Sequence, residues 1–260
     1  RQAARRGLTQ PPQDSLSGCG WIIFAVGKLG AEELNYSSDI DLIIMHDPDT
    51  NPLNDPATAQ SFYVAQTRAL VKLLSAATAD GIGWRVDLRL RPDPGATAVS
   101  IQIAAALGYY ESIARTWERA AFIRARPVAG DIEAGQNFLD EIQPFIWRRS
   151  LDYTVMDDMR TMLRHSPDSS EWTGFNLKTG HGGIRTIEFF THVLQLVFGG
   201  RDPEIRQHRT PNALHMLANK DWITSSQAEG LVALYKLLRR AEHRLQMIAD
   251  QQTHSLPRDD

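Results

Sequence analysis

Cysteine is nearly absent from this sequence, since Cys19 is the only one among 260 residues. A single thiol forms no intramolecular disulfide, so the disulfide-stapled secreted domains are excluded and a reducing cytoplasm is the expected location. Long apolar runs are lacking too. Because a helix that crosses a bilayer needs roughly 20 apolar residues, the sequence predicts no membrane-spanning helix and no membrane partner.

An excess of charge of one sign is also missing. The chain has 28 basic and 31 acidic side chains, for a formal net charge of -3. Proteins that bind nucleic acid through its phosphates usually carry a basic surplus, so we expect no nucleic-acid partner and no template-dependent polymerase. A hydrophobic fraction of 42% and a charged fraction of 23% are typical of a globular protein. The length suits one large domain or two modest ones.

Two common phosphate-binding glycine-loop patterns do not match the glycine-containing turn "VGKLG". It lacks the first glycine of the P-loop pattern, and Leu29 stands where that pattern requires a hydroxyl. It does not match the dinucleotide-binding pattern G-x-G-x-x-G either. Any nucleotide chemistry here must therefore use another arrangement.

The first half of the chain alternates strand-like and helix-like segments. Apolar runs bounded by glycine, strict alternation of apolar and polar residues, and apolar residues at helical spacing are the three signals used. They predict strands at 20–27, 39–47, 83–92 and 97–102, and a helix at 57–78. From Ala104 onward the pattern is almost entirely helical.

These segments predict an α+β fold, with a mixed sheet and flanking helices followed by an all-α helical bundle. Pro127 and Gly130 mark the expected boundary, so residues 20–130 form the sheet-containing domain and residues 131–260 the bundle. In residues 1–19 a basic, helix-like segment runs into a proline-rich break. We interpret that part as the end of an upstream helical segment and a linker.

Asp39 and Asp41 are the most distinctive pair of residues in the sequence. They lie two positions apart on a predicted strand, where side chains share a face and Cα atoms are about 6.5 Å apart. Asp87 lies on the polar face of another predicted strand. If the two strands are close in one sheet, three carboxylates surround one spot that suits one or two hard cations such as Mg²⁺.

A second interpretation of the three aspartates stays open. Pairs of the form D-x-D are common, and all three carboxylates also fit solvated positions at strand ends. The metal-site interpretation gains from the glycine turn before Asp39 and from Arg89 and Arg91, which share the polar face of Asp87. Guanidinium groups bind phosphate oxygens in a bidentate manner.

The motifs as a set resemble the polymerase-β-like nucleotidyltransferase superfamily. More narrowly, "GKLGAEELNYSSDIDLI", "WRVDLRLRP", "WERAAFIRARPVAGD" and "GGIRTIEF" are similar to the glutamine-synthetase adenylyltransferase/adenylyl-removing enzyme. The resemblance runs from about Gly20 to Pro257, with its most specific motifs between Gly27 and Arg126. Residues 20–130 would thus be the nucleotidyltransferase catalytic domain.

The resemblance implies a bifunctional family with two related catalytic domains on a longer chain, of which this sequence would be one. Three segments look most like the N-terminal, adenylyl-removing domain: "ELNYSSD", "RVDLRLRP", and "FIWRRSLDYTVMDDMR" followed by "GHGGIRTIEF". The implied reaction is phosphorolysis of the adenylyl-tyrosine bond of glutamine synthetase, which releases ADP. ATP-dependent adenylylation of a glutamine synthetase tyrosine is the alternative. A non-catalytic nucleotide-binding regulatory module is an alternative of another class.

Residue roles follow from the same resemblance. Asp39, Asp41 and Asp87 would be the catalytic metal ligands of a site with two Mg²⁺ ions. The expected nucleotide- and phosphate-binding residues are Gly27, Lys28, Ser38, Arg89 and Arg91. Lys28 departs from the superfamily, which often has serine there, so it fits either a phosphate contact or an exposed turn. The implied partners are adenylylated glutamine synthetase, ADP or ATP, phosphate and, for the full-length chain, the PII signal protein.

The last predicted helix carries a basic cluster of Arg239, Arg240, His243 and Arg244. Such a cluster fits contact with nucleic acid or with an acidic partner. The simpler interpretation is a solvated helix face, because apolar residues at helical spacing are expected to pack on the opposite side. Those residues are Leu234, Leu238, Ala241, Leu245 and Ile248.

Overall fold

The computed structural model describes residues 18–49, 53, 55–79, 81–149, 161, 175–249 and 252–256. They form two compact units. The first contains the described residues up to Gly30 and Asp39–Phe145, and the second contains Ala31–Ser38 and the described residues from Ile146 onward. The expected linker at 1–19 lies almost wholly outside the described residues.

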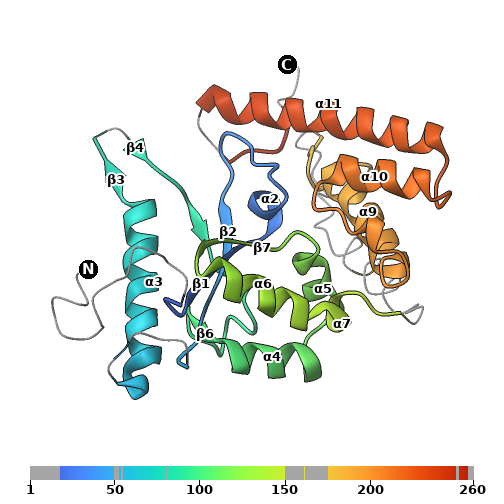
Figure 1. Cartoon of the computed structure of the whole chain (residues 1–260). Helices are drawn as coiled ribbons and strands as arrows, with labels where there is room; N and C mark the ends of the chain where they lie inside the picture. The colour runs from blue at the N-terminus through green and yellow to red at the C-terminus, as the bar shows by residue number, and fades with distance from the viewer. Residues whose placement is uncertain are drawn as a thin grey trace. The chain divides into compact units, whose positions relative to one another are not determined.

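A mixed sheet forms the centre of the first unit (Figure 1). Strand β2 (Ile40–His46) pairs antiparallel with β1 (Trp21–Ala25), which pairs antiparallel with β7 (Arg126–Gly130). On its other side, β2 pairs in parallel with β5 (Val86–Asp87) and then with β6 (Ile101–Gln102). Strand β2 therefore pairs with three other strands of the sheet, β1, β5 and β6.

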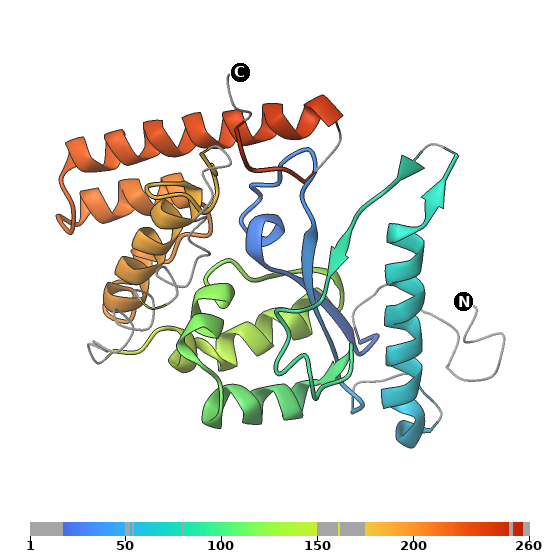
Figure 2. The ribbon, with the colours of Figure 1, turned by 180° about the vertical axis from the view of Figure 1, so that it is seen from behind.

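Helices and two short strands complete the first unit (Figures 1 and 2). They are α2 (Gly27–Gly30), η1 (Pro56–Thr58), α3 (Ala59–Ser75), the β3–β4 pair (Ala77–Thr78 and Gly81–Ile82), α4 (Ile103–Ser112), α5 (Thr116–Phe122), α6 (Ile132–Glu141) and the start of α7 (Gln143–Ile146). Helix α6 packs on the sheet, where the Phe138 ring lies 5.5 Å from that of Phe24. The mixed sheet with flanking helices confirms the predicted fold class.

Strand β2 is buried on both faces rather than on one. The sequence suggested alternation, with Ile43 on the same face as the aspartates, but every residue of the strand except Asp41 is buried. A strand covered on both faces has a nearly continuous apolar run, and "LIIM" is such a run. Asp41 is therefore the polar exception in an otherwise buried strand.

The predicted strand at 83–92 was too long. Only Val86 and Asp87 form a ladder, and Trp84 is 44% exposed. The following residues turn, and Arg91 donates to backbone oxygens of Leu88 and Pro94 at 2.7 and 2.8 Å. The alternating pattern thus describes a short strand followed by a loop that an arginine holds.

Strand β7 was not predicted, because the sequence indicated only helix and a domain boundary near Pro127 and Gly130. Proline is tolerated at a sheet edge, and β7 is the terminal strand of the sheet, with a register irregularity opposite Ile23 and Phe24. Helix α6 packs behind it, where Gly135 meets Pro127 and Ile22. Contacts group the residues as far as Phe145 with the first unit, and the domain boundary expected near Gly130 stays a prediction.

The second unit is helical in its described part. It contains α9 (Ile184–Phe198), η2 (Pro203–Ile205), α10 (Thr210–Asn219) and α11 (Ser225–Ala249), with α10 and α11 side by side (Figures 1 and 2). Leu238 is in its core and Ala241 and Leu245 pack against that core, as expected. Leu234 and Ile248 were predicted to face inward but are 41% and 79% exposed. Within the described residues, no helix is both long and apolar enough to cross a membrane.

Gly130 provides a test of the β1–β7 pairing. Its φ is +78°, and a Cβ there would overlap the backbone oxygen of Trp21. We expect Gly130→Ala to lower the free energy of unfolding by about 2 kcal/mol or more, because strain and overlap add. The control is Gly108→Ala in exposed α4, where a Cβ meets nothing and a gain of up to about 1 kcal/mol is expected. Urea unfolding measures both, and equal midpoints would contradict the assignment.

Candidate active site

Asp41 and Asp87 are brought together by the parallel pairing of β2 with β5. In that ladder Ile40 is the register partner of Val86 and Asp41 that of Asp87. Paired residues of neighbouring strands share a face, with the strands about 4.8 Å apart. The two carboxylates therefore project from adjacent positions on one face of the sheet. The sequence analysis expected this proximity if the two strands were close in one sheet.

Gly27 lies directly against the Asp41 carboxylate. Its φ is +56°, and a Cβ at this position would overlap Asp41 Oδ2. The backbone is fixed here as well, since the Val26 amide donates to the Asp41 carbonyl at 3.0 Å. Only glycine combines a positive φ with the absence of a Cβ that would overlap Asp41, and so fits here without strain. The predicted role of Gly27, to let the backbone approach phosphates, stays a prediction. Its close approach to Asp41 is a separate feature that the structure shows.

The turn that contains Gly27 is held by arginine. Arg126 Nε donates to the Gly30 carbonyl at 2.9 Å, and its Nη2 donates to the Leu29 carbonyl at 3.3 Å. These carbonyls end the short helix α2, where backbone oxygens have no helical partner. Arg126 thus fixes the glycine turn against the sheet from strand β7, a contact that no local pattern in the sequence indicates.

Asp39 has an arginine partner that the sequence analysis missed. Arg85 Nε donates to Asp39 Oδ1 at 2.7 Å, with the two side chains 43% and 27% exposed. The backbone reinforces this pairing, because the Ile40 amide donates to the Arg85 carbonyl at 2.8 Å. Arg85 precedes Val86 by one residue, so the parallel ladder itself places the guanidinium beside Asp39. Knowledge of the β2–β5 register would have identified Arg85 as the partner of Asp39.

Asp87 is engaged by Arg89 in a two-pronged contact. Arg89 Nε lies 3.0 and 2.9 Å from the two carboxylate oxygens, and Nη2 lies 2.6 Å from Oδ2. The Arg89 amide donates to the same carboxylate at 2.8 Å. The Arg89 side-chain hydrogen bonds lower the pKa of Asp87 below its ordinary value, although partial burial acts in the opposite direction. Asp87 is thus held ionised at neutral pH.

Arg91 occupies a different environment from Arg89. Its guanidinium lies among the carbonyls of the following loop, with Leu88 O at 2.7 Å and Pro94 O at 2.8 Å. Burial lowers its pKa, and the nearby Asp87 charge partly offsets this effect. In this arrangement Arg91 shapes the loop after β5. Its predicted contact with phosphate stays a prediction.

Lys28 and Ser38 are the remaining residues of the predicted site. Lys28 is half-buried in α2, directly after the glycine that meets Asp41. Ser38 is buried, and its Oγ accepts from the Asn35 amide at 3.0 Å. Ser38 therefore closes the turn from which the chain enters Asp39 and β2. The predicted phosphate contacts of Lys28 and Ser38 stay predictions.

Asp41 and Asp87 are register partners beside the Gly27 turn, and Asp39, just before β2, is paired with Arg85. In the part of the chain described, no three acidic, histidine or cysteine side chains are yet grouped as metal ligands. Asp39 and Asp87 are instead engaged by Arg85 and Arg89. The donor set nevertheless fits Mg²⁺, which prefers carboxylate oxygens, while Gly27 gives the Asp41 carboxylate its space.

Comparison with known proteins gives two matches to family models. The family described as glutamate-ammonia ligase adenylyltransferase matches residues 1–141. A second family, described as GlnD PII-uridylyltransferase, matches residues 156–260. The first match covers the carboxylates, the glycine turn and all four arginines described above.

Curated relatives match across both units. The bifunctional glutamine synthetase adenylyltransferase/adenylyl-removing enzyme of Xanthobacter autotrophicus is 51% identical over 98% of this chain and 26% of its own length. The protein of the same name from Bradyrhizobium sp. strain ORS 278 is 50% identical over 100% of this chain and 27% of its own length. The chain thus spans about a quarter of the length of these relatives.

The pairing of Arg89 with Asp87 predicts a pKa change on mutation. Arg89→Gln should raise the pKa of Asp87 toward that of an ordinary aspartate, because the charge and the side-chain hydrogen bonds are lost. Since the folded pKa is the depressed one, the pairing stabilises the fold above about pH 4, and this contribution disappears as the pH falls through that pKa. Carboxyl ¹³C NMR titration measures the shift. An unchanged Asp87 titration would refute the contact, and Arg68→Gln on exposed α3 is the control.

Proposed function

Because this chain belongs to the glutamate-ammonia ligase adenylyltransferase family, we propose that it removes AMP from an adenylylated tyrosine of glutamine synthetase by phosphorolysis, with release of ADP. The observation that carries the proposal is the register partnership of Asp41 and Asp87, with Asp39 two residues before Asp41. Nucleotidyl transfer depends on positioned charge rather than on covalent work by the protein. A cluster of carboxylates beside arginines at the edge of a rigid sheet suits that requirement.

The carboxylates are proposed to hold Mg²⁺, which would neutralise negative charge on the attacking and the departing oxygens. Asp41 is aimed by its fit against Gly27, and Asp87 is adjacent through the ladder. Asp39 completes the set once its carboxylate turns from Arg85, and Asp87 joins once it turns from Arg89. Both ion pairs are proposed to give way when a cation binds.

When Asp39 and Asp87 turn to the cation, Arg85 and Arg89 become available to bind phosphate. Arg85 and Arg89 are partly to largely exposed, and their planar groups match phosphate oxygens in a bidentate way. We assign them to the incoming phosphate and to the AMP phosphate. Arg91 positions the loop that carries Arg89, through its contacts with backbone carbonyls. Lys28 and Ser38 flank Gly27 and Asp39 in sequence and are proposed to contact the nucleotide phosphate.

The proposed step forms and breaks one bond at the same phosphorus atom. An oxygen of inorganic phosphate attacks the α-phosphorus of the tyrosyl-AMP ester. The bond from phosphorus to the tyrosine oxygen breaks, and its electron pair leaves with the tyrosinate, which takes up a proton from water. The products are ADP and an unmodified tyrosine. Arg85 and Arg89 stabilise the charge on the equatorial oxygens throughout.

The opposite reaction is a second candidate, because the printed names of the relatives contain both an adenylyltransferase and an adenylyl-removing activity. In that case the tyrosine oxygen attacks the α-phosphorus of ATP, and pyrophosphate leaves. The same carboxylates and arginines serve both directions, so the co-substrate decides between them. We prefer the removing direction because the "ELNYSSD" and "RVDLRLRP" motifs look most like those of the adenylyl-removing domain. A PII protein as a partner of the longer chain is also proposed.

Asp41→Asn tests the proposed function. With Mg²⁺, phosphate and adenylylated glutamine synthetase, the wild-type protein should release ADP only when phosphate is present. The variant should lose this turnover by about 100-fold or more, because one ligand of the developing charge is removed. Asp140→Asn, on the exposed face of α6, is the matched control and should retain activity.

Each other outcome has a definite meaning. Pyrophosphate release from ATP with unmodified glutamine synthetase, and no ADP release, would replace the removing direction by the adding one. Full activity of Asp41→Asn would reject the carboxylate mechanism in both directions. Binding of nucleotide with Mg²⁺ but no turnover of either substrate would favour a non-catalytic regulatory module.

A further inference from the structure

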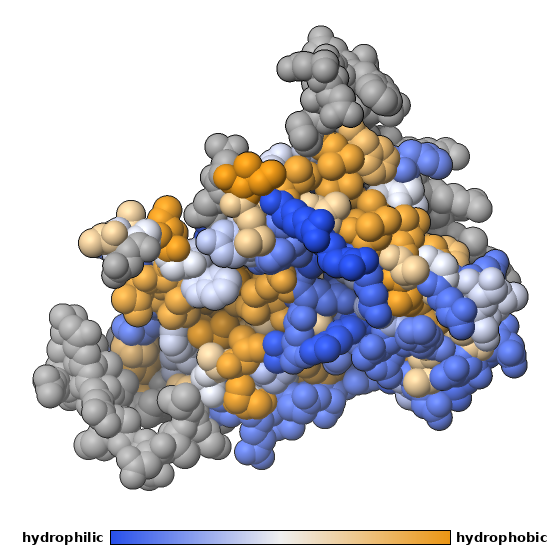
Figure 3. All heavy atoms as spheres, turned by 90° about the horizontal axis from the view of Figure 1, so that it is seen from above, coloured by the Kyte–Doolittle hydropathy of each residue, from blue (hydrophilic) through white to orange (hydrophobic). Residues whose placement is uncertain are grey.

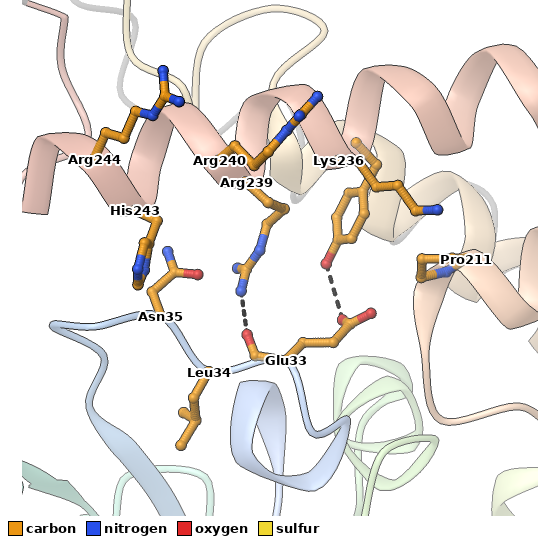
Figure 4. Close-up of a pocket in the computed structure, with 10 residues that line it drawn as sticks. Glu33, Leu34, Asn35, Pro211, Lys236, Arg239, Arg240, His243 and Arg244 are labelled. Carbon is orange, nitrogen blue, oxygen red and sulfur yellow. Dashed lines mark hydrogen bonds between the residues drawn. The ribbon is translucent and has the colours of Figure 1, made fainter.

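A pocket of about 600 Å³ lies within the second unit, between the segment Glu33–Asn35 and helix α11 (Figure 4). None of its lining residues belongs to the carboxylate site. A pocket of this size is in the range that holds small molecules. The residues that line it are Glu33, Leu34, Asn35, Pro211, Tyr235, Lys236, Arg239, Arg240, His243 and Arg244.

The pocket is built on fixed side chains. Figure 4 shows Arg239 and His243 pointing to the segment Glu33–Asn35, and Arg239 Nη2 donates to the Glu33 carbonyl. The Tyr235 hydroxyl lies 2.9 Å from Glu33 Oε2, and His243 Nδ1 accepts from the Tyr36 amide at 3.1 Å. These contacts hold one wall of the pocket against α11. Arg239 is thus not on the solvated face that the sequence predicted.

The wall is further fixed by a fully buried carboxylate. Glu242 has no exposed side-chain surface, and its Oε2 accepts from Asn35 Nδ2 and from Arg239 Nη1, the latter at 3.3 Å. Two residues after Asn35, the Ser37 amide donates to Gln246 Oε1 at 3.3 Å. A buried carboxylate needs such partners to stay charged. The segment is therefore preorganised beside α11 before any ligand arrives.

Lys236, Arg240 and Arg244 form an exposed row of positive charge at the pocket. They are spaced four residues apart along α11, so they share one side of the helix. Within the residues that the structure describes, none of the three forms an ion pair. Like charges at this spacing repel one another, and a bound anion would relieve that repulsion.

Among the residues that the structure describes, Glu33 is the only acidic one that lines the pocket. Its carboxylate is directed to the Tyr235 hydroxyl and to the Thr210 amide, the latter at 3.1 Å. The row of cations is therefore not balanced from within the pocket. Figure 3, which looks down on the face formed by α11, shows strongly hydrophilic side chains in a band bordered by hydrophobic ones. The exposed apolar residues of α11 include Leu237, at 56%.

We propose that this pocket binds a phosphate-bearing small molecule. Guanidinium groups match phosphate oxygens geometrically as well as in charge, and Arg240 and Arg244 with Lys236 supply three exposed cations on the α11 side of the lining. Leu34, Pro211 and the Tyr235 ring provide apolar surface for the rest of the ligand. The proposal is independent of the proposed function, because it uses neither Asp39, Asp41 nor Asp87.

Calorimetric titration tests the proposal with pyrophosphate, ADP and adenosine as probes. EDTA is present throughout, so that metal-dependent binding at the carboxylate site does not contribute. The double variant Arg240→Gln/Arg244→Gln removes two charges four residues apart on α11. Its matched control is Arg68→Gln/Lys72→Gln, which removes two exposed charges at the same spacing on α3.

Pyrophosphate and ADP should bind the wild-type protein, and adenosine should bind at least tenfold more weakly. The α11 double variant should raise the Kd of pyrophosphate at least tenfold, whereas the α3 variant should leave it within about twofold. Equal losses in both double variants, or no binding of pyrophosphate and ADP at millimolar concentrations, would overturn the proposal. Lys236→Gln is a second pocket variant if the double variant does not fold, and it should also weaken binding.

Discussion

The parallel pairing of β5 with β2 is the interaction on which the candidate site depends. Two ladder positions, Ile40 with Val86 and Asp41 with Asp87, place two carboxylates side by side and bring Arg85 onto Asp39. A shift of one residue would turn every side chain of the strand to the other face. The register is secured because β2 is buried on both faces and antiparallel to β1 over five residue pairs. Core packing in the sheet thus fixes the geometry of its polar end.

Gly27 adds a second constraint to the same strand. The turn after β1 adopts a left-handed backbone conformation and approaches the Asp41 carboxylate closely. Arg126 from β7 holds the carbonyls that follow. Strands β2, β5 and β7 and the turn after β1 therefore each contribute a residue or a backbone group to one small region. Such sites, supported by rigid elements, hold reacting groups more precisely than loops do.

The spacing of apolar residues in the sequence predicted several individual strands and helices correctly. The apolar runs gave β1 and β2, helical spacing gave α3, α9 and α11, and the D-x-D pair with Asp87 indicated a shared site. The pairings of Arg85 and Arg126 depend on strand register and sheet order, which one sequence does not display. Pro127 hid β7 because proline argues against a strand except at an edge. The Glu33–Asn35 segment packs on residues more than 200 positions later, such as Arg239 and Glu242, and no short motif predicts such a contact.

The central claim is that Asp39, Asp41 and Asp87 bind a divalent cation together. The most direct test is an EPR titration of the purified chain with Mn²⁺, a spectroscopic substitute for Mg²⁺, that counts bound ions. Asp41→Asn should lose at least one bound Mn²⁺ or weaken it by tenfold or more, while Asp140→Asn should match the wild-type protein. Identical Mn²⁺ binding by wild-type protein and Asp41→Asn would contradict the account, because the carboxylates would then be solvated ion pairs with Arg85 and Arg89.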